Sequence, residues 1–304
     1  MRSLPATAAG LLLAAVLLAA GVLPAVRSLS GRVAGAVPAP LGQLLAALLA
    51  AMALVRAVAA VVPHLGHQLE LLGSMVLVGS ALMLGLRGRT RLLALLAVAL
   101  VAVLSLVNLP WYAHLLAHGH NLVPLIFLWD WTRGRAPRLR LGFVGANLLW
   151  LAGIPAAILL GLADPLLNAV PPEAVTSLVD PAAVVAGIAP PDADPLLGVR
   201  FLAVFAFLQT MHYLLWMVFF QLLGRDQVRR SPPPARWRFW ALAAAASVLV
   251  WAAYAVSYYD GRAAYSVLGA FNAYLEQPVA AWLLLTALPV SATTALVGRL
   301  RDGG

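Results

Sequence analysis

The sequence predicts an all-α fold: a polytopic transmembrane helical bundle of about nine spans, within a range of eight to ten. Hydrophobic residues make up 63% of the chain and charged residues only 10%, whereas soluble domains carry about 25% charged residues. Runs of about 20 mostly apolar residues, the length that a helix needs to cross a bilayer, recur along the whole chain. We therefore expect a single integral membrane domain over residues 1–304.

Each span is placed where an apolar run reaches that length between polar or proline-containing connections. The last run is longer than one crossing, and we expect it to kink or split at Pro278. The longest connection, residues 164–198, is expected to be an external loop rich in proline and aspartate. The predicted spans are residues 6–26, 41–62, 68–86, 92–109, 111–131, 141–163, 199–223, 239–258 and 263–297.

The placement of arginine predicts the orientation, because positive residues gather in the cytoplasmic connections of membrane proteins. Most arginines here fall in alternate connections, whereas residues 164–198 carry only acidic charges. We expect the acidic loop outside and the C-terminus in the cytoplasm, as in a bacterial inner membrane. The arginines on the predicted cytoplasmic side are Arg27, Arg32, Arg87, Arg89, Arg91, Arg133, Arg135, Arg138, Arg140, Arg225, Arg229, Arg230, Arg236, Arg238, Arg299 and Arg301.

Several classes of function are excluded or disfavoured. The chain has no cysteine, which excludes disulfides, thiolate ligands and cysteine-based iron–sulfur centres. It has no glycine-rich nucleotide loop, no Walker sequence, no G-x-S-x-G and no H-E-x-x-H. The net charge of +9 does not indicate nucleic-acid binding, because the arginines lie in short connections rather than on one surface.

The most informative residues are ionisable side chains inside or at the edge of the predicted spans. Such groups are costly in a bilayer, so they usually face the bundle interior and mark a functional site. Imidazoles and carboxylates together are also what a transition metal needs. We predict metal ligands at His64, His67, His114, His118, His120, His212 and Glu276, with catalytic roles for Glu70 and Glu276.

Two of the histidine groups come from short segments. Residues 63–70 (PHLGHQLE) place His67 three residues before Glu70, so the two share a face if this segment is helical. The alternative is an interfacial loop with exposed histidines. Residues 114–121 (HLLAHGHN) place His114 and His118 one helical turn apart. Gly119 and Pro124 are expected to let the backbone deform and re-aim His120.

The remaining candidates are single residues. His212 and Glu276 each lie about 13 residues into a predicted span, so at 1.5 Å per residue both are expected about 20 Å from the external end. Alternatively, each only forms a hydrogen bond across helices. Arg56 is a candidate for binding an acidic group of a cofactor; the alternative is that it only extends to the membrane interface.

The scattered intramembrane histidines resemble those of the histidine-rich membrane oxygenases. Within that class, PHLGHQLE and the isolated His212 are similar to the bacterial carotenoid dioxygenases that form retinal. The resemblance implies iron bound by histidines from several helices, in a pocket that faces lipid. The chain departs from that family at Glu70, which replaces an acid nearer the first histidine, and HLLAHGHN has no counterpart there.

Three functions are open at this point. The first is a non-haem oxidoreductase or oxygenase with one or two irons, or copper or zinc, acting on a lipid-soluble small molecule with a redox partner. The second is a haem b protein for electron transfer or haem handling, with paired histidines as axial ligands. The third is a metal-ion or proton transporter, which the absence of an evident internal repeat disfavours.

Overall fold

The computed structural model of the chain describes residues 47–48, 51–52, 55, 62–132, 135–167, 179–219 and 233–287. Every regular element within these residues is helical and none is a strand, so the all-α prediction is confirmed. The predicted span at 6–26, most of the span at 41–62 and Arg56 lie outside the described residues.

Four helices are long and apolar enough to cross a membrane: His64–Gly85, Gly88–Val107, Pro137–Leu159 and Pro195–Trp216. Many apolar side chains of these helices are exposed on the outside of the bundle, which would be unfavourable in water. Helix α5, all of whose residues are described, buries none of them, although it consists largely of leucine, valine and alanine. An apolar surface of this kind matches lipid rather than water. Membrane character is therefore supported for these four helices among the described residues.

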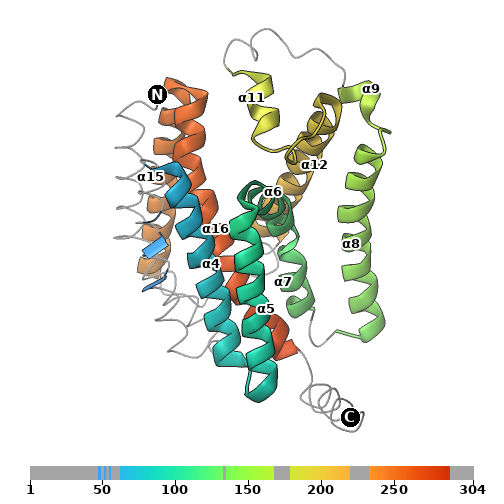
Figure 1. The fold of residues 1–304 in the computed structure, drawn as a ribbon, viewed down its shortest axis with the longest axis vertical. Helices are drawn as coiled ribbons and strands as arrows, with labels where there is room; N and C mark the ends of the chain where they lie inside the picture. Colours follow the sequence, from blue (N-terminus) through green and yellow to red (C-terminus); the bar gives the residue numbers. More distant parts are fainter. Residues whose placement is uncertain are drawn as a thin grey trace.

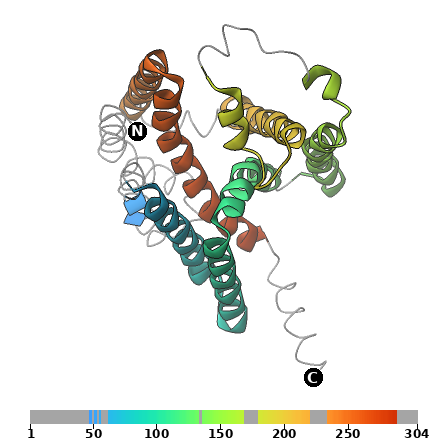
Figure 2. The ribbon, with the colours of Figure 1, turned by 45° about the horizontal axis from the view of Figure 1, so that its top comes forward.

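The long helices form two groups on either side of a broken central helix (Figure 1). Helix α16 packs along α4 and α15, and α5 packs on α4; in the other group, α12 packs against α8. Figure 2 shows α6 and α7 between the two groups. The long helices are α4 (Pro63–Gly85), α5 (Gly88–Val107), α8 (Pro137–Leu159), α12 (Pro195–Tyr213), α15 (Pro233–Val256) and α16 (Tyr258–Ala287).

Several helices begin earlier than the apolar runs that predicted them. Helices α4, α8 and α12 begin at Pro63, Pro137 and Pro195, whereas the corresponding runs begin four or five residues later. Proline suits the first position of a helix, because it has no N–H and its φ is already helical. The run of apolar residues marks the lipid-facing part of each helix and misses this first turn.

The predicted helix over residues 111–131 is interrupted. Helix α6 (Leu109–Gly119) ends at a glycine, a short 3₁₀ segment η2 (His120–Leu122) follows, and α7 (Pro124–Trp131) begins at a proline. Helix α16, in contrast, continues through Pro278 as one element rather than splitting there. The helix is therefore interrupted next to His120, as the sequence predicts, whereas α16 is not split at Pro278.

The two ends of the bundle carry opposite charge. The α4–α5 turn and the segment before α8 lie at one end, whereas α9 (Asp164–Leu167), α11 (Pro181–Ala186) and the start of α12 lie at the other (Figure 1). The first end carries arginine, including Arg87 and Arg138, and the second carries aspartate, including Asp164 and Asp194. The alternation inferred from the arginines is thus present in the described part of the fold.

An ion pair holds the acidic end together. The guanidinium of Arg200 donates to Asp164 from Nε at 2.9 Å and from a terminal nitrogen at 2.5 Å, and it also donates to the carbonyl of Leu159 at 3.1 Å. Gly161, at φ +86°, leaves room for this guanidinium, since a Cβ there would lie 2.6 Å from it. The connection after α8 is thereby attached to the first turns of α12.

We expect introduced thiols at the two ends to react from opposite sides of the membrane. Ala136→Cys, before α8, and Ala183→Cys, in α11, place single thiols at exposed positions in a chain that has no cysteine. A membrane-impermeant maleimide added to intact cells should label only one of the two, and detergent should expose the other. Labelling of both in intact cells would contradict the arrangement.

The Arg200–Asp164 pair predicts an acid-dependent loss of stability. Hydrogen bonding from Arg200 lowers the pKa of Asp164, so the pair stabilises the fold above the ordinary carboxyl pKa of about 3.9 and less as the pH falls through the lowered value. The effect should be small, because both side chains are partly exposed. Thermal midpoints between pH 7 and pH 3 should fall less for Asp164→Asn than for wild type or for the control Asp192→Asn.

Candidate functional site

His120, His212 and Glu276 meet in the interior, each from a different helical segment. His212 in α12 is fully buried (0% exposed) and Glu276 in α16 is 3% exposed. Nε2 of His212 lies 3.5 Å from Oε1 of Glu276. The ring of His120, the first residue of η2, lies 5.4 Å from the ring of His212, centroid to centroid. We refer to these three residues, of which His120 is only half-buried, as the buried site.

The break after α6 places His120. Its Nδ1 lies 2.8 Å from the carbonyl oxygen of Leu116, one turn earlier. A ring nitrogen that donates to a carbonyl carries the proton, so Nε2 of a neutral His120 keeps its lone pair. A hydrogen bond of this kind is typical of histidines that bind metals, because it fixes the tautomer and the ring orientation.

His212 and Glu276 lie at similar distances along helices that begin earlier than the predicted spans. His212 follows Pro195 by 17 residues and Glu276 follows Tyr258 by 18, so the two lie about 26 Å and 27 Å from the helix starts at 1.5 Å per residue. Their predicted depth in the membrane stays a prediction. A π-helical segment, η3 (Leu214–Phe219), directly follows the helical turn of His212; such segments recur at functional sites.

A second polar group adjoins the buried site. Ser74 in α4 is fully buried and donates from Oγ to Oε1 of Gln277 at 2.7 Å. Glu70, 5% exposed, lies one turn before Ser74, and its Oε2 is 3.4 Å from Nδ1 of His67. Tyr112 in α6 lies beside both Ser74 and Glu70. Three helices therefore meet at Ser74.

His114 and His118 form a separate pair near the acidic end. Their rings lie 4.3 Å apart. Both nitrogens of His118 face carbonyl oxygens, Nδ1 that of His114 at 3.0 Å and Nε2 that of Phe201 at 3.3 Å. In this orientation both ring nitrogens of His118 are directed at backbone carbonyl oxygens rather than at a space for a metal ion.

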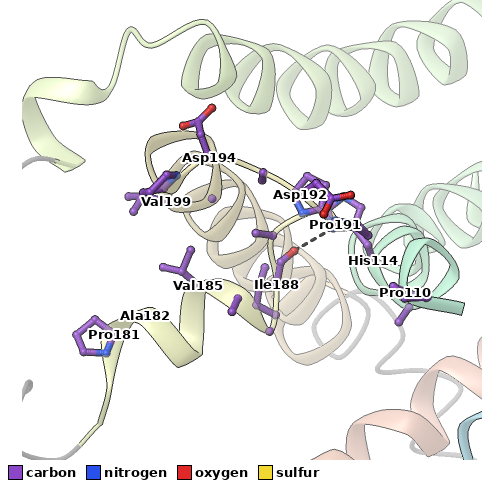
Figure 3. A pocket seen from close by; sticks show the side chains of 18 residues that line it. Pro110, His114, Pro181, Ala182, Val185, Ile188, Pro191, Asp192, Asp194 and Val199 are labelled. Atoms are coloured by element: carbon purple, nitrogen blue, oxygen red, sulfur yellow. Dashed lines mark hydrogen bonds between the residues drawn. The ribbon is translucent and has the colours of Figure 1, made fainter. Parts of the chain in front are cut away.

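A cavity of about 720 Å³ lies beside His114, between α6, α11 and the start of α12 (Figure 3). Its wall is mostly apolar, with Val185 and Ile188 among the lining residues. Nδ1 of His114 bonds the carbonyl of Ile188 at 2.9 Å. The cavity is lined by His114 and not by the residues of the buried site, so it belongs to the acidic end of the bundle.

The six histidines do not all meet. His64 is exposed in the first turn of α4, and the side chain of His67 is 51% exposed. Among the described residues, no three histidine, aspartate or glutamate side chains stand arranged around one ion. The metal-site prediction stays a prediction, while the structure groups its residues as His120–His212–Glu276, His114–His118 and His67–Glu70. The role predicted for Arg56 lies outside the described residues.

Sequence reasoning missed Ser74 and Gln277, which look like ordinary polar residues in apolar helices. Tyr112, whose position near a span end suggests the interfacial aromatic belt, instead lies half-buried against Ser74 and Glu70. No family model, curated protein or solved structure matches the chain. The site is therefore interpreted from its own geometry.

The buried His212–Glu276 pair predicts a non-additive pattern of stability. His212→Leu should lower the free energy of unfolding by about 1–3 kcal/mol, because it leaves a buried carboxyl facing an apolar side chain. His212→Leu/Glu276→Leu should lie closer to wild type, since well-packed apolar side chains can replace a buried pair. Reversible denaturation in detergent measures both, with the exposed Thr210→Ala in α12 as control. A double variant less stable than His212→Leu would contradict the coupling.

Proposed function

We propose that this chain is a membrane-embedded, metal-dependent oxidoreductase or oxygenase acting on a lipid-soluble small molecule, with one iron held by His120, His212 and Glu276. The proposal narrows the ligand set predicted from the sequence to the three residues of the buried site. His64, His67 and the His114–His118 pair are assigned no ligand role in it.

The burial and the spacing of His212 and Glu276 carry the proposal. Two ligand atoms bound to one ion at about 2.1 Å lie about 3.4 Å from each other at the tetrahedral angle, and about 3.0 Å from each other at the right angle of an octahedral site. The observed separation of Nε2 and Oε1 is 3.5 Å, close to the tetrahedral value. The pair His67–Glu70 has nearly the same separation, 3.4 Å, but His67 is exposed. Burial therefore distinguishes His212 and Glu276 as the candidate ligands.

The position of His120 is consistent with the same ion. Two imidazoles on one tetrahedral ion have ring centroids about 5.2 Å apart, given metal–nitrogen bonds of about 2.0–2.1 Å. The observed separation is 5.4 Å. The bond from Nδ1 to the Leu116 carbonyl leaves Nε2 of His120 as the nitrogen with a lone pair. His120 would supply the third ligand.

Two histidines and one carboxylate form the ligand set of many non-haem iron oxygenases, and iron bound in this way keeps open positions at which oxygen is activated. The chain's own contribution is to hold these groups away from water. His212 is fully buried, with the rings of Tyr213 and Trp216 nearby at 5.6 Å and 6.5 Å, centroid to centroid. A substrate dissolved in the bilayer could approach the described helices directly from the lipid.

The haem alternative fits the histidine pair less well. Axial histidines on opposite sides of a haem iron have ring centroids about 6.4 Å apart for bonds of about 2.0 Å. The rings of His120 and His212 are closer, at 5.4 Å, and tilted by 62°.

We propose the topology inferred from the sequence for the whole chain, with about nine spans and the arginine-rich end in the cytoplasm of a bacterial inner membrane. The segregation of arginine and aspartate at opposite ends of the described helices supports this orientation. This orientation predicts that Ala183→Cys, and not Ala136→Cys, is labelled in intact cells.

Metal analysis of the detergent-purified protein tests the function. Wild-type protein should hold about one iron per chain, because three ligand residues suit one non-haem ion. His120→Ala, His212→Ala and Glu276→Ala should each lower iron affinity by more than tenfold, since even outer partners of ligands change affinity 10–100-fold. His64→Ala, an exposed histidine on α4, is the matched control and should bind iron as wild type does.

The outcomes separate the alternatives. Unchanged iron content in the His212→Ala and Glu276→Ala variants would overturn the assignment. A sharp Soret band in the purified protein would replace non-haem iron by haem. Zinc or copper bound in place of iron would keep the ligand set and change the chemistry assigned to it. Comparison of lipid extracts from cells with and without the protein then searches for the substrate.

A further inference from the structure

We infer that Ser74 is a positioning residue of the buried site: its hydrogen bond to Gln277 holds α16 in the rotation that directs Glu276 toward His212. The inference rests on the proposed function, because the effect of Ser74 is measured through the ion at that site. Ser74 itself touches neither the ion nor the substrate.

The hydrogen bond joins two helices far apart in the sequence. Oγ of Ser74 in α4 donates to Oε1 of Gln277 in α16 at 2.7 Å, and Ser74 is fully buried. Gln277 directly follows Glu276. Successive residues of an α-helix project about 100° apart at 3.6 residues per turn. A side chain fixed on α4 at position 277 therefore fixes the direction of position 276, toward α12.

Helix α16 needs this support at this point. The next residue, Pro278, has no N–H, so it donates no hydrogen bond to the preceding helical turn. A helix that loses such a bond bends more easily at that turn. The contact between Ser74 and Gln277 attaches α16 to a neighbouring helix one residue before the proline, at the turn that lacks this backbone hydrogen bond.

Helix α4 is itself held firmly against its neighbours. Gly73, next to Ser74, contacts Met52 so closely that a Cβ at this position would overlap its sulfur. At the other end of α4, a Cβ on Gly85 would lie 2.7 Å from Leu285 and 3.2 Å from Trp282 of α16. The two helices therefore approach closely at Gly85 and are joined by a hydrogen bond at Ser74.

Ser74 also adjoins the helix that leads to His120. Tyr112 in α6 lies beside Ser74 and Glu70, and α6 ends immediately before His120. One buried hydroxyl thus lies between the helix that carries the carboxylate and the helix that leads to one imidazole. A change at Ser74 should disturb the separation of these two ligands without removing either.

The test compares Ser74→Ala and Gln277→Leu with Ser80→Ala in detergent-purified full-length protein. Ser80 is a matched control, because it lies on the same helix and bonds only the carbonyl of Val76 among the contacts found for it. Equilibrium dialysis gives the affinity for Fe²⁺, and the visible d–d absorption of bound Co²⁺ reports the geometry of the ligands. Ser74→Ala and Gln277→Leu should lower affinity 10–100-fold and shift the cobalt band, whereas Ser80→Ala should do neither.

Two further variants distinguish positioning from loss of folding. Ser74→Thr keeps the hydroxyl and should retain affinity and spectrum close to wild type. Ser74→Ala/Gln277→Leu should lose no more affinity than either single variant, because both remove the same hydrogen bond. Size-exclusion profiles and thermal midpoints identify any unfolded variant; if Ser74→Ala does not fold, the comparison of Ser74→Thr with Gln277→Leu decides.

The failures of the two proposals are distinguishable. If Ser74→Ala and Gln277→Leu bind Co²⁺ with the affinity and spectrum of Ser80→Ala, while His212→Ala loses the ion, Ser74 has no positioning role and the metal site stands. Additive losses in the double variant would likewise overturn the positioning role. If His212→Ala and Glu276→Ala also bind the ion as wild type does, the proposed function itself is wrong.

Discussion

The structure depends on placing an imidazole and a carboxylate together in an apolar interior. His212 and Glu276 are almost completely buried, and burial of an isolated charge is far too costly for either to be tolerated alone. Each therefore needs polar partners in that interior, and each lies close to the other. The helices that carry them, α12 and α16, belong to the two groups that flank the broken central helix. The pair thus links the two halves of the bundle.

The break in the central helix follows from a related constraint. In lipid, every backbone carbonyl left free by a broken helix must find a donor. Next to the break after α6, side chains of the same segment approach backbone carbonyls: His118 that of His114, His120 that of Leu116, which also accepts the backbone N–H of His120, and Asn121 that of Ala117. The sequence HLLAHGHN therefore adds side-chain hydrogen bonds to the backbone beside the break. Of these side chains, His120 also reaches the buried site.

The class of fold and many residues of the candidate site can be predicted from the sequence. Apolar length identifies α4, α5, α8 and α12, and helical spacing correctly pairs His67 with Glu70. The depth argument brings His212 and Glu276 to one level because both lie similar distances from helix starts. Contacts between distant segments are not predictable in this way. Ser74 and Gln277 are uncharged residues 203 positions apart, and no periodicity distinguishes their contact from many alternatives. The first helical turns are missed because proline, not an apolar residue, begins them.

The distances at the centre distinguish a packing role from a ligand role. Direct hydrogen bonds strengthen and shorten where water is excluded, and the neighbouring Ser74–Gln277 bond is indeed short, at 2.7 Å. His212 and Glu276 share the same dry surroundings yet stay 3.5 Å apart. An ion held between the two side chains, as proposed, would account for this longer separation. In that case the adjacent bond from Ser74 would help to keep the two side chains at that distance.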